Sequence, residues 1–190
     1  MRHYELLTAL PPAPEGPQAP AMPMLALVER CLPELGEADQ MLVEALLELS
    51  DTERADEPVA ADRDRMERAL RLAQECGHEA MAQWLSFDRA LREALAARRA
   101  AARGLDWPAP RPDVADHAAS VAAVVTEAEG AATPELRERA LDTARVRELE
   151  ALVGGSPFST EAVVARIVAA TVQQAWDFRD DGELPEEDWR

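Results

Sequence analysis

Apolar residues recur every three or four positions along most of this chain, which is the spacing of one face of an α-helix. The longest such pattern runs from Asp62 to Arg103, with apolar positions at Met66, Leu70, Ala73, Met81, Trp84, Leu91 and Leu95. Gly77 lies inside it, and a glycine within a helix costs about 1 kcal/mol relative to alanine. The pattern therefore predicts either one long helix or two helices that break near Gly77.

Shorter patterns of the same period predict five further helices, over about 24–32, 36–49, 113–129, 134–153 and 159–176. Strand signals are almost absent, because aromatic residues make up only 4% of the chain and no Asn-Gly or Asp-Gly turn joins two alternating runs. The sequence thus predicts an all-α protein, a helical bundle of about six helices.

Proline interrupts the helical patterns in two places. Residues 1–10 are predicted to form a short strand or an extended arm, and the prolines that follow predict an extended Pro-rich N-terminal segment. Three further prolines predict a stiff connection over 104–112. We therefore expect either a single helical domain over 1–190, or two lobes, 1–103 and 113–179, joined by this connection, with an acidic tail over 180–190.

The segment between the last two predicted helices has clear helix-ending and helix-starting chemistry. Gly154 and Gly155 can take the positive φ that often ends a helix, and Pro157 cannot continue one. Ser159 is a favourable N-cap for the final helix, and Phe158 stands just before it in the position of a hydrophobic staple. This segment predicts a helical hairpin.

Alanine supplies much of the hydrophobic content, with 38 Ala against one Tyr and three Phe. Alanine favours helices but buries little surface, so we expect close helix packing and modest stability. All 20 basic residues are arginine. The absence of lysine excludes Schiff-base and P-loop lysine chemistry.

The formal net charge is −17 and the isoelectric point is near 4.5. Such a surface repels phosphate backbones and anionic lipids, so nucleic acid is not an expected partner. Two cysteines do not make a disulfide framework, and no apolar run is long enough to span a bilayer. We expect a soluble cytoplasmic protein with reduced thiols and no direct membrane span.

The charges are unevenly distributed along the chain. Residues 29–67 hold 13 acids and four arginines, whereas residues 89–103 hold five arginines and a single acid. This uneven distribution has two interpretations. The charged residues form solvated helix faces, or they form two oppositely charged docking surfaces.

Motifs for catalysis, cofactors or metals are weak. Glu75 and His78 have the Glu-x-x-His spacing of a di-iron bundle helix, but that site requires the motif twice. Asp113, Asp116 and His117 resemble a carboxylate–imidazole pair, yet acids at a helix N-terminus explain them as well. No nucleophile motif, dinucleotide fingerprint or Cys-x-x-Cys occurs. We therefore predict no catalytic residue, no cofactor and no metal ligand.

The residues that favour a protein partner are aromatic or basic and lie near predicted helix ends. Trp84 and Trp176 fall within helical patterns and are expected in the core, whereas Trp107 precedes a proline and Trp189 lies in the acidic tail. Tryptophan is enriched where interfaces bind most strongly. The candidate partner contacts are Arg98, Arg99, Arg103, Trp107, Phe158 and Trp189.

Three stretches together carry a family resemblance. The first is an N-terminal segment ending in Leu-Pro, here 3–11. The second is an Arg-rich helix closing in Gly-x-Asp, here 98–106. The third comprises a Leu-Asp-x-Ala-Arg helix, a Gly-x-Pro-Phe turn and a last helix ending in Trp, here 141–145, 155–158 and Trp176.

In these stretches the chain resembles a family of bacterial proteins encoded with V-type ATP synthase subunits. That family is itself similar to a reduced form of the central-stalk subunit of V/A-type ATPases, the helical subunit that couples the rotating shaft of the catalytic head to the membrane ring. Ser156 and Val146 depart from the family pattern, which has His and an aromatic residue there.

The resemblance implies a mechanical, non-enzymatic role: a subunit or assembly protein of a proton- or sodium-translocating V/A-type ATPase, peripheral to the inner membrane through the complex. Its partners would be other V/A-type ATPase subunits, in the central stalk or the membrane ring. Two alternatives remain from the residues alone. One is a stand-alone acidic helical adaptor or regulatory protein, and the other is a metal-binding helical-bundle enzyme.

Overall fold

The computed structural model describes residues 3–10, 22–50, 59–107, 116–155 and 157–180. Within these ranges the chain is helical and contains no strand, which confirms the all-α prediction. The elements are α1 (Tyr4–Ala9), α2 (Met24–Cys31), η1 (Leu32–Glu34), α3 (Glu37–Ser50), α4 (Val59–Glu75), α5 (Glu79–Ala102), α6 (Ala118–Glu129), α7 (Pro134–Val153) and α8 (Thr160–Asp180).

The described residues thus form eight α-helices rather than about six, for two reasons. Tyr4–Ala9 is a helix and not the strand or extended arm expected from the sequence. The long pattern over 62–103 belongs to two helices, α4 and α5. The prolines at 11–20 lie outside the described residues, so the extended form of that segment stays a prediction.

Glycine ends both α4 and α5. Gly77 has φ +72° and Gly104 has φ +68°, the left-handed conformation that glycine adopts at low cost. His78 N donates to Ala73 O at 2.9 Å, and Leu105 N donates to Ala100 O at 2.9 Å. These are the closing bonds of two Schellman motifs, so each helix stops at a defined residue and the chain turns sharply.

The hairpin between α7 and α8 forms as predicted. Ser159 caps α8, because Ala162 N donates to Ser159 Oγ at 3.1 Å. Gly154 has φ −55°, however, and Gly155 does not have positive φ either. The last turn of α7 therefore continues in right-handed geometry through Gly154, whose N donates to Glu150 O at 2.9 Å. The two glycines permit the positive φ that ends many helices, but they do not adopt it here.

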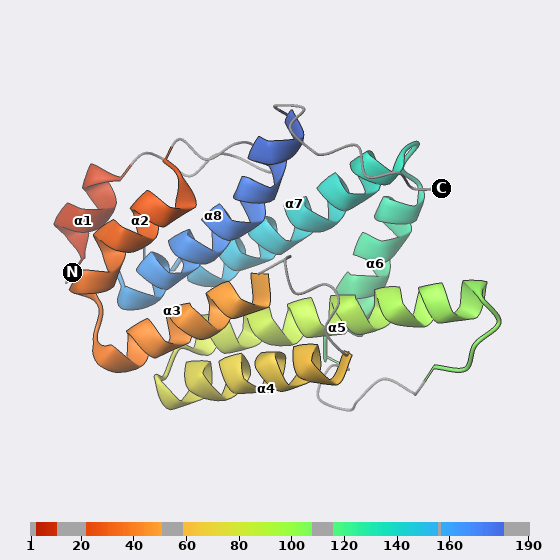
Figure 1. Ribbon diagram of the computed structural model, residues 1–190, viewed down its shortest axis with the longest axis horizontal. Coiled ribbons are helices and arrows are strands. Elements are labelled where there is room, and N and C mark those ends of the chain that lie inside the picture. The colour runs from red at the N-terminus through yellow and green to blue at the C-terminus, as the bar shows by residue number, and fades with distance from the viewer. Residues whose placement is uncertain (1–2, 11–21, 51–58, 108–115, 156, 181–190) are drawn as a thin grey trace.

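Two hydrophobic cores lie in the bundle. The larger joins α2, α3, α4, the first half of α5, and α8. The smaller lies where the middle of α5 meets α6 and α7. Figure 1 shows α5 running beneath α7 and toward the right end of the molecule, with α3 and α4 beside its first part and α6 farther along it. Helix α5 therefore connects the two cores.

Helix α8 packs against α2 and α3 as well as α7, so elements from before and after the Pro-rich connection share the larger core. Buried alanines lie on α4 and α8, including Ala69, Ala73 and Ala165. Their small side chains let each of the two helices pack closely against its own neighbours. Among the described residues, none of the helices combines the length and the apolar character needed to cross a membrane. The 181–190 part of the predicted acidic tail lies outside the described residues.

Candidate functional site: a charged groove

The described residues form a groove with a volume of about 760 Å³. Its walls come mainly from α5 and α7. The end of α3, the start of α4, the middle of α8 and the segment Arg103–Trp107 after α5 contribute the rest. A smaller cavity of about 140 Å³ adjoins it, and Asp62, Arg92 and Trp107 line both. Trp107 is 40% exposed, so its indole stands at the border of the two hollows.

A buried carboxylate lies at the base of the groove. Asp88 is only 2% exposed and belongs to α5. Its Oδ1 accepts from Arg145 Nε at 2.7 Å, and its Oδ2 accepts from Arg92 Nε at 2.7 Å. Two guanidinium groups therefore fix both carboxylate oxygens, which is how a buried charge is compensated.

The network continues from Arg145 to the last helix. Arg145 Nη1 donates to Asp142 Oδ1 at 2.6 Å, and Trp176 Nε1 donates to Asp142 Oδ2 at 3.0 Å. The backbone carbonyl of Arg145 accepts from Trp84 Nε1 at 2.9 Å. Helices α5, α7 and α8 are thus joined by hydrogen bonds as well as by apolar packing.

Electrostatics keep this network ionised. Burial alone would raise the pKa of Asp88, but Arg92 and Arg145 more than offset it and lower the pKa to about 2. Burial would likewise lower the pKa of Arg145, yet Asp88 and Asp142 hold that pKa above its usual range. At neutral pH the groups are charged and bonded to one another. The arrangement is therefore suited to hold a rigid binding surface rather than to transfer protons.

The bonding of Asp88 predicts a loss of stability in acid. Its pKa is lowered from 3.8 to about 2, so the carboxylate stabilises the fold fully above about pH 4 and loses this contribution as the pH falls to about 2. This lowering of the pKa corresponds to about 2 kcal/mol in the free energy of unfolding. Urea unfolding at about pH 5 and about pH 2 should show this loss in the native protein and a smaller one in Asp88→Asn. Equal losses in the two proteins would contradict the assignment.

The structure brings three of the six candidate partner contacts together. Arg99, Arg103 and Trp107 line the groove and are exposed. Arg98 lies outside it, where its Nη1 is 3.6 Å from Glu129 Oε2 on α6. Phe158 packs against Tyr4, with ring centroids 4.9 Å apart. Trp189 lies outside the described residues.

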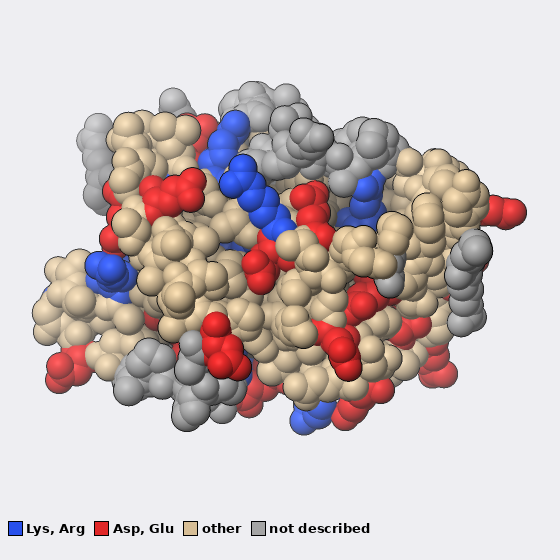
Figure 2. All heavy atoms as spheres, turned by 180° about the vertical axis from the view of Figure 1, so that it is seen from behind, with Lys and Arg blue, Asp and Glu red and all other residues tan. Residues whose placement is uncertain are grey.

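The two tryptophans expected in the core are confirmed there, since Trp84 is 6% exposed and Trp176 is fully buried. Acidic side chains are scattered over the face shown in Figure 2, with basic side chains between them, so neither sign makes one continuous patch on that face.

Sequence reasoning missed Asp88, although the sequence held a signal for it. Asp88 follows Trp84 by four positions and precedes Leu91 by three, so it lies on the same face of α5 as these two apolar residues. An acid in that position faces the core and requires a cationic partner. The pattern could not name Arg145, because that partner lies on another helix.

Comparison of the chain with protein-family models, with curated proteins and with solved structures gives no match. The residues and the fold therefore carry the evidence on function.

Proposed function

We propose that this chain is a non-enzymatic protein of a V/A-type ATPase, either a subunit or an assembly protein, similar to the central-stalk subunit that couples the rotating shaft to the membrane ring. In this proposal it acts on the cytoplasmic side of the membrane by holding other subunits of the complex. The groove is its docking surface.

One observation carries the proposal: two stretches that give the family resemblance line the same groove. Arg99 and Asp106 come from the Arg-rich stretch that closes in Gly-x-Asp, and Asp142 and Arg145 come from the Leu-Asp-x-Ala-Arg stretch. Trp176, which ends the last helical pattern, donates a hydrogen bond from its indole to the Asp142 carboxylate. The residues shared with the family therefore concentrate in one place, as expected of a functional surface.

The other shared segments also meet. His3 Nε2 lies 3.1 Å from Thr160 Oγ1, and the Tyr4 ring packs against Phe158 of the Gly-x-Pro-Phe turn. His3 is 3% exposed. These contacts fix α1 on the start of α8 and give the N-terminal stretch a structural role in this chain.

The groove has the features of a protein-binding site. Trp107 supplies an exposed aromatic anchor, and Arg99 and Arg103 place guanidinium groups beside it. The bonded network of Asp88, Arg145 and their neighbours keeps the base of the groove in a fixed shape. Little ordering is then needed when a partner segment enters, and this favours affinity.

The test is to purify the tagged chain from its native host under mild conditions. We expect V/A-type ATPase subunits to co-purify with it and to be identified by mass spectrometry. An unrelated acidic helical protein carrying the same tag is the control. A preparation that contains no ATPase subunit while the intact ATPase is present in the same cells would contradict the proposal. Specific capture of a different protein through the groove would support the stand-alone adaptor instead.

A further inference from the structure

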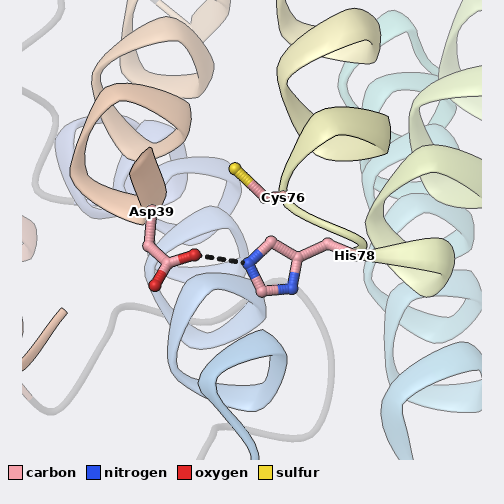
Figure 3. A group of neighbouring side chains, drawn as sticks. All are labelled: Asp39, Cys76 and His78. Carbon is pink, nitrogen blue, oxygen red and sulfur yellow. Dashed lines mark hydrogen bonds and ion pairs between the residues drawn. The ribbon is translucent and has the colours of Figure 1, made fainter. Parts of the chain in front are cut away.

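Three side chains with different donor atoms meet at the start of α3, away from the groove. Asp39 lies in the first turn of α3, and Cys76 and His78 lie at the turn between α4 and α5. One carboxylate oxygen, the thiol sulfur and one imidazole nitrogen all lie within 4.8 Å of one another. Figure 3 shows Asp39 and His78 pointing toward each other, with the Cys76 sulfur beside them.

The fold holds these donors in place before any ion binds. The Schellman motif at Gly77 fixes the backbone between Cys76 and His78, because His78 N donates to Ala73 O and Gly77 N donates to Gln74 O. His78 is 7% exposed, and its Nε2 lies 2.8 Å from Asp39 Oδ1. Two ligands from one rigid turn therefore face a third ligand from another helix.

The carboxylate is oriented by a contact of its own. Gly36 N donates to Asp39 Oδ2 at 3.3 Å, which directs Oδ1 toward His78. Cys76 Sγ donates to Ala38 O at 3.5 Å, so the thiol already lies against the first turn of α3. The Gly36 bond to Asp39 is of the kind that orients a metal ligand, whereas the thiol proton of Cys76 would leave when the sulfur binds an ion.

The surroundings favour a cation. Burial raises the pKa of the Cys76 thiol, and the nearby carboxylates of Asp39 and Glu75 raise it further. The same negative charges attract a divalent ion, and a bound ion would reverse their effect by stabilising the thiolate.

We propose that Asp39, Cys76 and His78 bind one Zn²⁺ ion, with water as the fourth ligand. Mixed sulfur, nitrogen and oxygen donors suit zinc, whereas magnesium and calcium prefer oxygen alone. Tetrahedral zinc sites place their donor atoms about 3.3–3.7 Å apart, so small side-chain movements from the present positions complete the site. The ion would clamp the start of α3 to the α4–α5 turn.

The sequence did not predict this set. The Glu-x-x-His spacing pairs Glu75 with His78 as candidate ligands, but Glu75 is exposed and is not part of the cluster. The third ligand, Asp39, lies 39 residues before His78, and only the packing of α3 on α4 brings it close.

Zinc titration of the reduced, metal-free full chain tests the proposal, with a chromophoric chelator as competitor. We expect one ion per chain and a higher melting temperature on binding. Cobalt substitution should give the absorption of a tetrahedral site with a thiolate-to-cobalt charge-transfer band. The variants Cys76→Ser and His78→Gln should each bind zinc at least about tenfold more weakly. The Cys76→Ser variant keeps Cys31, whose thiol is buried in the larger core and is not part of the cluster.

Glu75→Gln is the matched control, because it removes a neighbouring charge without removing a proposed ligand. It should keep one-to-one binding and the charge-transfer band. The proposal is overturned if the native chain binds no zinc, if cobalt shows no thiolate band, or if Cys76→Ser binds as well as the native chain. The cobalt spectrum of the native chain tests the zinc proposal even where a variant does not fold.

Discussion

Replacing Asp88 with asparagine is expected to lower the free energy of unfolding by about 3–5 kcal/mol at neutral pH. The amide is neutral and has one acceptor oxygen in place of two, so Arg92 and Arg145 both lose the charge of Asp88 and one of them also loses its hydrogen bond. Arg145 is the more sensitive of the two, because its side chain is 17% exposed against 37% for Arg92. For a chain of this length, such a change lowers the melting temperature by about 6–20 °C.

Glu48→Gln is the matched control for that experiment. Glu48 also pairs with an arginine, Arg68, at 3.1 Å, but the two side chains are 36% and 45% exposed, against 2% for Asp88. An exposed pair contributes about 0–1 kcal/mol, so this variant should unfold close to the native protein. Thermal unfolding, followed by circular dichroism, measures the stability of both variants. If the two variants lose equal stability, the network at the base of the groove is not the rigid element described above.

Trp176→Ala is expected to cost a similar amount, about 3–5 kcal/mol. The indole is fully buried, and its loss leaves a cavity between α7 and α8. The substitution also removes the hydrogen bond to Asp142 Oδ2 and the ring that lies 4.8 Å from the Arg139 guanidinium carbon. Urea unfolding gives the free energy directly.

Two further variants separate these contributions. Trp176→Phe retains much of the buried ring and removes the hydrogen bond, so it should cost less, about 1–3 kcal/mol. Trp107→Ala removes an exposed indole and should change the stability by no more than about 0.5 kcal/mol. A loss in Trp107→Ala as large as that in Trp176→Ala would show that Trp107 belongs to the core instead of the groove wall.

The helix boundaries were predictable where local chemistry determines them. The break near Gly77 is one of the two alternatives that the pattern left open, and it appears in the structure together with the helix end before Gly104 and the cap at Ser159. Each depends on one residue and its immediate neighbours in the chain, which the sequence displays directly.

The short helix α1 was not predictable in the same way. Six residues are too few to form a stable helix in isolation, so periodicity over Tyr4–Ala9 carries little information. Its position depends on contacts with distant residues, chiefly His3 with Thr160 and Tyr4 with Phe158. Tertiary packing therefore decided between a helix and an extended arm.

The candidate site was only partly predictable for the same reason. Arg99, Arg103 and Trp107 follow one another near the end of α5, so their shared surface could be inferred from the chain alone. The pairing of Asp88 with Arg145 spans 57 residues, and the bond between Trp176 and Asp142 spans 34. Residue identity predicted that such charges require partners, but only the packing of α5, α7 and α8 determines which partners they find.

The central claim is that the groove docks another V/A-type ATPase subunit, and site-specific photo-crosslinking in the native host tests it most directly. A photoreactive amino acid at position 107 lies at the groove, and the same group at position 25 lies on α2, outside the groove lining. Trp107 and Leu25 are both exposed in the native chain, so neither replacement disturbs the core. We predict crosslinks to an ATPase subunit from position 107 and not from position 25. Crosslinks to that subunit from position 25 alone, or from neither position while the complex is present, would contradict the claim.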